Sequence, residues 1–372
     1  MKGAGDSLFE SVPNFSDGRD DRTITAIAGA ARDSHLLDVD PDPDHNRTVV
    51  TLAGFAPNLV EALMASVRVA IELIDVRQHQ GVHPRVGGAD VLPIVALDST
   101  PLSRSREVAR ELGGRIWDEL KVPVFFYGEH QSLADIRAGR GHLDLGGPDL
   151  HPTAGAVCVG ARPKLVAFNV ILHGVDAGAA RAIARSLRES GGGLRGVHAL
   201  AFELSGGRVQ LSMNLFRLEE TTPAMVIAEL ERRGVAIASQ HVVGLCPAAV
   251  ANQAAAGRLL EARLAAAAAR AGADRCMELG NNEHVALARR LRRESEGLAA
   301  LGIDQDALLA GAERAAALVP VLEVAGVLDR ELEAMLGCAA AGLREALTSK
   351  TASTYAARVA ALDRRLRRAD ID

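Results

Sequence analysis

The chain has 372 residues, of which 48% are hydrophobic and 24% charged, as in an ordinary globular protein of about two or three domains. Its formal net charge of −5 excludes a general attraction to nucleic acid. The four cysteines lie far apart without a CxxC pair, which favours a reduced chain over a disulfide framework or a zinc ribbon. We see neither a signal peptide nor a membrane-spanning run, and we expect a soluble, cytoplasmic protein.

The first part of the chain predicts the order β-α-β-β-α-β, followed by a further helix and strand. The expected strands are residues 8–15, 36–39, 48–52, 91–97 and 122–127. Helices are expected from Asp20 or Asp21, from Pro57 and from Ser103, because apolar residues recur there every three or four positions. A fourth, short helix opens with a capping box at Ser132. Residues 41–46 form a stiff acidic turn between two of the strands.

The same order recurs between residues 165 and 245. The expected strands are residues 165–172, 197–204, 209–215 and 235–245. Helices follow the N-caps Asp176 and Thr222, the second with a proline at its first position. Both halves therefore predict an α/β (α+β) fold of two ferredoxin-like split-βαβ subdomains, which we expect to face a common groove.

From Pro247 onward the composition changes to Ala, Leu, Arg and Glu, which is typical of helices. Amphipathic helices are expected over residues 249–271, 283–301, 304–318, 322–347 and 355–367. Pro320 and the glycines at 302, 326 and 337 separate them. No chemical motif is visible in this part, so we interpret it as a packing or dimerisation module.

Residues 77–90, RQHQGVHPRVGGAD, concentrate polar side chains between an apolar helix and a strand. Loops on a rigid scaffold carry function more often than cores do. His79 and His83 have the spacing of a zinc pair on a helix, but Gly81 and Pro84 interrupt any helix there. His83 is then either a structural hydrogen-bonder or a proton-transfer group, with cationic neighbours that favour neutral imidazole.

Other polar stretches leave alternatives open. The four aspartates between residues 38 and 44 lack a calcium-loop pattern, so they form a solvated turn unless Asp40 orients a histidine. Arg47 could then bind a substrate carboxylate with both guanidinium arms. The small residues of 155–162 allow either close approach of a ligand or a tight connection. Gln210, Ser212 and Asn214 share one strand face, which is either solvated or lines a polar groove.

Seven short motifs together resemble glutamate formiminotransferase over about residues 7 to 255. They are ESVPNFSDG from residue 10, LDVD from 37, NRTV from 46, HQGVHPRVG from 79, DV from 90, GARP from 160 and SMNL from 212. The resemblance implies domains at residues 1–160 (N-terminal formiminotransferase subdomain), 161–255 (C-terminal subdomain) and 256–372 (Ala-rich helical module). It also implies a homodimer.

The resemblance further implies transfer of a formimino group from N-formimino-L-glutamate to N5 of tetrahydrofolate, in histidine degradation. His83 matches the catalytic histidine of the family, and Asp40 an aspartate that assists it. Residues 151–162 correspond to the folate-binding segment. The folate- and substrate-binding residues we expect are Arg47, Arg85, Thr153, Ala154, Gly155, Ala156, Gly160, Ala161, Arg162 and Asn214. Tetrahydrofolate is the co-substrate, and we expect no metal.

Three motifs depart from the pattern of the family. Val82 replaces a glutamate, Ile171 replaces an asparagine, and residues 87–91 read GGADV where the family has GALDV. These departures prompt an alternative, a folate- or small-ligand-binding homologue without catalysis. The tail lacks the Pro-Gly-Gly-Gly-Ser signature of the cyclodeaminase domain that is fused to this family in some organisms.

Overall fold

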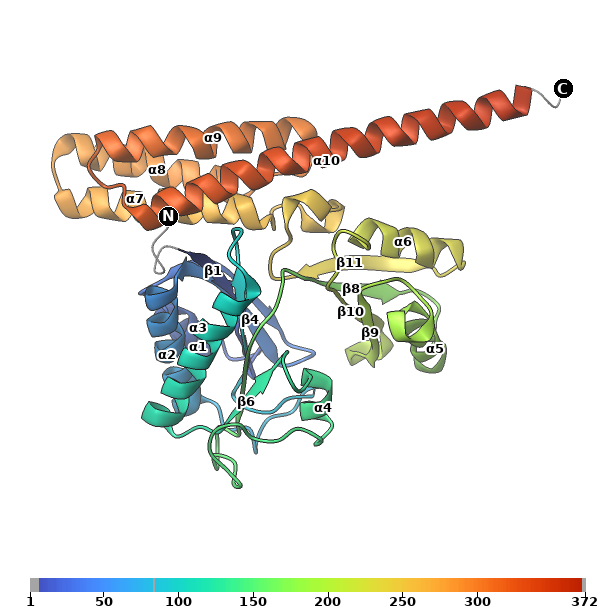
Figure 1. The fold of residues 1–372 in the computed structure, drawn as a ribbon, viewed down its shortest axis with the longest axis horizontal. Coiled ribbons are helices and arrows are strands. Elements are labelled where there is room, and N and C mark those ends of the chain that lie inside the picture. The colour runs from blue at the N-terminus through green and yellow to red at the C-terminus, as the bar shows by residue number, and fades with distance from the viewer. Residues whose placement is uncertain (1–6, 83, 370–372) are drawn as a thin grey trace. The chain divides into compact units, whose positions relative to one another are not determined.

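The computed structural model describes residues 7–82 and 84–369, with side chains up to residue 350. The backbone packs into two compact units (Figure 1). The first holds the chain up to Leu245 together with Asp329–Ala334, and the second holds Cys246–Leu328 and the chain from Met335. The prediction of three functional domains within these units stays a prediction.

The first sheet has a ferredoxin-like antiparallel core, which two parallel strands, β6 and β7, extend beyond β5. Within the described residues its strands are β1 (Leu8–Ser11), β2 (Asn14–Phe15), β3 (His35–Asp42), β4 (Arg47–Phe55), β5 (Ala89–Ala96), β6 (Val124–Tyr127) and β7 (Val157–Ala161). β1 and β2 each pair with β4 on one side and with β5 on the other, and β3 pairs with the far edge of β4. All of these pairings are antiparallel. Pro13 separates β1 from β2 because it lacks the N–H that a ladder needs.

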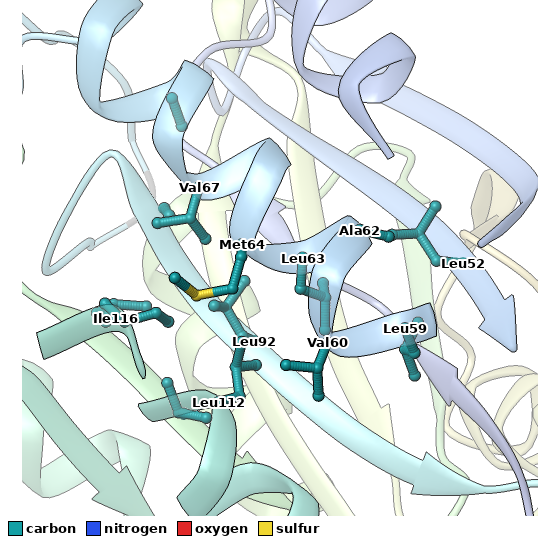
Figure 2. Packing of buried hydrophobic residues seen from close by; sticks show 14 of the residues in the cluster. Leu52, Leu59, Val60, Ala62, Leu63, Met64, Val67, Leu92, Leu112 and Ile116 are labelled. Carbon is teal, nitrogen blue, oxygen red and sulfur yellow. The ribbon is translucent and has the colours of Figure 1, made fainter. Parts of the chain in front are cut away.

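Three helices, α1 (Asp21–Ala30), α2 (Ala56–Leu73) and α3 (Leu102–Arg115), pack together on this sheet and bury its core. Asp20 caps α1 as predicted. The predicted apolar stripe of α2 is buried and packs against Leu92 of β5 and Leu112 of α3 (Figure 2). α3 continues into a π-helical turn, Ile116–Leu120. The helix expected from Ser103 is therefore confirmed, and its last turn is widened.

The sequence did not predict β7. The small residues of 155–162 predict a tight connection or a ligand loop, but Val157–Ala161 is a buried strand parallel to both β5 and β6. A strand buried on both faces has no polar alternation, so its pattern resembles that of a small-residue loop. A Cβ on Gly160 would lie 2.4 Å from the Tyr127 carbonyl oxygen, which explains the glycine by strand packing.

The second sheet confirms the repeated pattern. Its strands are β8 (Val166–Leu172), β9 (Val197–Glu203), β10 (Val209–Leu215) and β11 (Ile237–Val243). Their order, β11-β8-β10-β9, is antiparallel throughout and ferredoxin-like. Helices α5 (Ala177–Leu187) and α6 (Pro223–Arg232) start at the predicted caps, where the Asp176 and Thr222 side chains accept backbone N–H groups. A short helix, α4 (Leu133–Arg137), lies between β6 and β7 of the first sheet in sequence and is capped by Ser132.

The second unit is helical, as predicted, but its boundaries differ. The helices are α7 (Leu260–Leu279), α8 (Asn282–Ala299), α9 (Gln305–Val324) and α10 (Arg330–Ala369). Residues 249–259 form short turns instead of the start of a helix. Pro320 lies inside α9 at an exposed position, where water can bond the carbonyl that the proline leaves free. None of the helices in the described residues combines the length and apolarity that a membrane span requires.

Candidate active site

The loop after α2, residues 77–86, is fixed on both sides of residue 83. His83 itself lies outside the described residues. On the N-terminal side of residue 83, Asn46 Nδ2 donates to the Gln80 carbonyl (3.1 Å), and His79 Nε2 lies 2.8 Å from the Asn46 carbonyl oxygen. Asn46 adopts a left-handed backbone (φ 48°), which asparagine tolerates better than most residues. The turn between β3 and β4 thus supports the loop.

The base of the same loop is joined to the segment predicted to bind folate. Val76 N donates to the Thr153 carbonyl (2.9 Å), and Ala156 N donates to the Val86 carbonyl (3.2 Å). Backbones approach closely here. A Cβ on Gly87 would lie 2.0 Å from the Ala156 carbonyl oxygen, so glycine is required at this crossing. Two motifs about 70 residues apart in sequence therefore form one structure.

Asp90 is a fully buried carboxylate beneath the loop. Its Oδ2 atom bonds Arg47 Nη1 (3.0 Å) and Arg137 Nη2 (2.9 Å), and its Oδ1 atom accepts the Val86 N–H (2.6 Å). Burial alone would raise the pKa of Asp90, but the two guanidinium groups outweigh it and hold that pKa below its ordinary value. Asp90 is therefore an anion that fixes the far end of the loop.

Arg47 serves this buried pair. Its Nε atom donates to Asn14 Oδ1 (2.8 Å) while Nη1 bonds Asp90. Burial lowers the pKa of Arg47 to about 10, which still leaves the guanidinium charged at neutral pH. The contact with Asp90 accounts for an arginine here without a ligand, so its expected role with a substrate carboxylate stays a prediction. Arg137 of α4 was not predicted, because only the fold brings it to Asp90.

Asp40, at the end of β3, is held by the second sheet. Its Oδ2 atom accepts the Gly244 N–H (2.9 Å) and lies 3.3 Å from His241 Nε2. Asp40 is nearly buried, whereas the side chain of His241 is 48% exposed. In the described residues, a carboxylate–imidazole pair, Asp40 and His241, therefore joins β3 of the first sheet to β11 of the second. His241 carried no signal in the sequence.

Residues 8–162 match the formiminotransferase domain, N-terminal subdomain. Glutamate formimidoyltransferase from Thermoplasma acidophilum is 36% identical over 269 residues, which cover 65% of this chain and 88% of that protein. The chain belongs to the glutamate formimidoyltransferase family. The enzyme of the same name from Streptococcus pyogenes serotype M1 is 35% identical over 267 residues, 65% of this chain and 89% of that protein.

Some relatives of the formimidoyltransferase family are longer. The formimidoyltransferase-cyclodeaminase of Rattus norvegicus is 35% identical over 272 residues, which are 64% of this chain but 50% of that protein. The likeness thus extends over about half of such fused proteins. It leaves about a third of this chain unmatched in each of these alignments.

The acidic turn of this formimidoyltransferase family member is used in ion pairs. Asp42 Oδ2 lies 2.7 Å from His45 Nδ1. Burial would raise the pKa of Asp42, but the His45 side chain and the backbone N–H groups of His45 and Asp44 together outweigh it and lower that pKa. Asp44 bonds Arg208 Nη2 (2.6 Å) and Ser205 Oγ, on the turn between β9 and β10. Asp44 thus ties the turn to the second sheet, whereas Asp42 holds the turn itself together.

The remaining predicted binding residues differ in accessibility. Ala154, Ala156, Gly160 and Ala161 are buried, and Gly155 is buried with a positive φ of 73°, whereas Thr153, Arg85 and Arg162 are partly exposed. On β10, Asn214 is exposed and Gln210 is buried. The polar face predicted for this strand is therefore solvated at one end and covered at the other.

Proposed function

We propose that this chain transfers the formimino group of N-formimino-L-glutamate to N5 of tetrahydrofolate, giving 5-formiminotetrahydrofolate and L-glutamate. The family assignment supports this proposal, because two relatives named glutamate formimidoyltransferase match this chain over nearly nine tenths of their own length. Tetrahydrofolate is a co-substrate here rather than a resident cofactor.

His83 is the general acid and base of the proposed reaction. N5 of tetrahydrofolate attacks the formimino carbon, and the imidazole of His83 removes the proton from N5. The tetrahedral intermediate then collapses as the imidazolium protonates the leaving nitrogen of glutamate. Imidazole suits both steps because its ordinary pKa is near 6.5, and such catalysis contributes roughly 10²–10⁴-fold.

The environment of the loop supports this role. Anchors on both sides of residue 83, from Asn46 to Gln80 and from Asp90 to Val86, restrict the loop before substrate binds. Such preorganisation matters, because displacement of a reacting group by about 1 Å can cost 10²-fold in rate. In the proposed reaction, the buried carboxylate of Asp40 assists His83 by stabilising positive charge on its imidazole.

Both substrates carry carboxylates, which arginine binds with two parallel hydrogen bonds. Arg85, next to Pro84, and Arg162, at the end of β7, are partly exposed and are the proposed ligands. Thr153 and the backbone of residues 154–156 lie beside the loop and would position the folate. Asn214 would contact substrate from the second sheet. Arg47 would act mainly through Asp90.

The test measures 5-formiminotetrahydrofolate formed by the purified full chain from both substrates. His83→Ala should lower kcat by roughly 10²–10⁴-fold with little change in KM, because it removes proton transfer rather than binding. His173→Ala, at an exposed histidine after β8, is the matched control and should keep wild-type kcat. Undiminished kcat in His83→Ala would refute the role of His83.

A non-catalytic homologue is the second candidate, favoured by two departures from the family pattern. Val82 is 45% exposed beside residue 83, where a carboxylate would be expected to stand. Ile171 pairs with Gln210 and Ser239 in the second sheet, where the family has an amide. This candidate predicts a higher melting temperature with tetrahydrofolate but no product. Product formation would exclude it.

We also infer from the family that the protein is a cytoplasmic homodimer that acts in histidine degradation. Light scattering on the purified chain tests the dimer. A mass about twice the 39.1 kDa of one chain is expected, and a mass of one chain at all concentrations would contradict it.

A further inference from the structure

Two histidines and an aspartate meet where the α4 segment leaves and rejoins the first sheet. His130 precedes α4, and His142 and Asp144 follow it. Their ligand-type atoms, two imidazole nitrogens and a carboxylate oxygen, all lie within 4.8 Å of one another. In the part of the chain that the structure describes, no other trio of His, Cys, Asp or Glu meets this criterion.

The distances suit a single ion after small movements. His130 Nε2 lies 2.9 Å and His142 Nε2 lies 3.9 Å from the same atom, Asp144 Oδ1. Two donors on one tetrahedral zinc are ~3.3 Å apart when each bond is about 2.0–2.2 Å long. Both imidazoles are exposed, with 45% and 67% of their side chains accessible, so they can rotate into place. The two rings already lie 5.1 Å apart, centroid to centroid.

The carboxylate is held in position by neighbours that leave Oδ1 directed at the histidines. Asp144 Oδ2 accepts the Phe126 N–H (2.6 Å) and Gln131 Nε2 (2.9 Å). Gln131 also donates to the His142 carbonyl and accepts the His142 N–H. One glutamine thus joins both limbs of the segment. Such outer hydrogen bonds orient the ligands of metal sites, whereas a simple surface ion pair does not need them.

We propose that His130, His142 and Asp144 form a binding site for one divalent transition-metal ion. Imidazole nitrogens favour ions such as Zn²⁺, Ni²⁺ or Cu²⁺, whereas Mg²⁺ and Ca²⁺ prefer an all-oxygen set. Three protein ligands leave further positions to water, as the exposure of the site allows. The geometry that supports this site does not depend on the proposed transferase reaction.

A bound ion would tie the two ends of the α4 segment together. α4 carries Arg137, whose Nη2 atom bonds the buried Asp90. An ion at the base of the segment would restrict the opening of residues 130–144 and so favour the Arg137–Asp90 contact. The consequence is structural, namely slower amide hydrogen exchange across α4 when the ion is bound.

Isothermal titration of ZnCl₂ into the full chain, previously treated with EDTA and desalted, tests the proposal. We expect one Zn²⁺ per chain and slower exchange of the α4 amides. His142→Ala should weaken binding by at least about 10-fold, and Gln131→Ala by about 10–100-fold, as removal of an outer-shell partner does. His173→Ala, at an exposed histidine outside the cluster, should bind as the wild type does.

Several results would overturn the site. They are no zinc binding by the wild type at a large excess of zinc, binding unchanged in His142→Ala, or equal loss in His142→Ala and His173→Ala. Because the His142 side chain is mostly exposed, its removal should leave the fold intact. The fluorescence of Trp117, compared between His142→Ala and the wild type, checks that the fold is intact. Asp144→Asn, which keeps an oxygen to accept the Phe126 N–H but removes the charge, should also weaken zinc binding.

Discussion

Replacing Asp90 by Asn is the sharpest structural perturbation of the candidate site. The change is nearly isosteric, but it removes the negative charge that faces two arginines. Arg47 and Arg137 would then be left as neighbouring cations with 14% and 19% of their side chains exposed. An amide at this position can still accept hydrogen bonds, so the main loss is electrostatic.

The burial of the pair sets the expected magnitude. Breaking a buried ion pair by neutralising one partner costs about 3–5 kcal/mol, because it leaves an uncompensated charge out of water. The matched control is Asp75→Asn, just before the same loop. Asp75 bonds Arg77, whose side chain is 63% exposed, and such a solvent-exposed pair contributes little to stability.

The chain offers a local probe for the assay. It contains one tryptophan, Trp117, which packs against the core of the first sheet. Its fluorescence during urea unfolding therefore reports the α/β unit and not the helical unit. We expect Asp90→Asn to lower the urea midpoint by several times the shift in Asp75→Asn. Equal shifts would refute the claim that Asp90 is held by a buried charge network.

The pH dependence of stability tests the charge of Asp90 independently. The pKa of Asp90 is lowered in the folded protein, so its contribution to stability is present above the unfolded value of about 3.9 and is lost as pH falls through the folded pKa. The difference in stability between wild type and Asp90→Asn should therefore be largest near neutral pH and shrink in acid below pH ~4. A difference that stays constant into acid would contradict the assignment.

Three further predictions concern positioning and packing. Asn46→Gly keeps the left-handed backbone but removes the side-chain bond to the loop, so kcat should fall by up to about 10²-fold with a small change in melting temperature; unchanged kcat would contradict the anchor. Gly160→Ala should destabilise the α/β unit by about 1–3 kcal/mol through overpacking, whereas Gly29→Ala, with open space in α1, should stabilise it by up to about 1 kcal/mol. His241→Gln removes the imidazole that lies 3.3 Å from Asp40 Oδ2, so kcat should fall relative to the His173→Ala control, and an unchanged kcat would limit this pair to a structural role.

Local hydrogen bonds made much of the fold predictable. The caps at Asp20, Ser132, Asp176 and Thr222 depend on residues at most three positions away, so their sequence signals were sufficient. The repeated split-βαβ order followed from the alternation of such segments with strands. β7 could not be recognised, because its pairing with β5 and β6 is decided by distant residues.

The candidate site was predictable only in part. Its motif residues were visible because polar side chains and glycines gather in one loop. The partners of Asp90 and Asp40 were not, since Arg137 lies 47 positions and His241 201 positions away in sequence. In the helical unit, Pro320 predicts a helix end, but α9 continues through it, because tertiary packing overrides the local preference.

The most direct test of the central claim is glutamate release by the purified full chain from N-formimino-L-glutamate, with and without tetrahydrofolate. The account predicts catalytic release only when tetrahydrofolate is present, with one 5-formiminotetrahydrofolate formed for each glutamate. Release that does not depend on tetrahydrofolate, or no release by folded protein at saturating substrates, would contradict it.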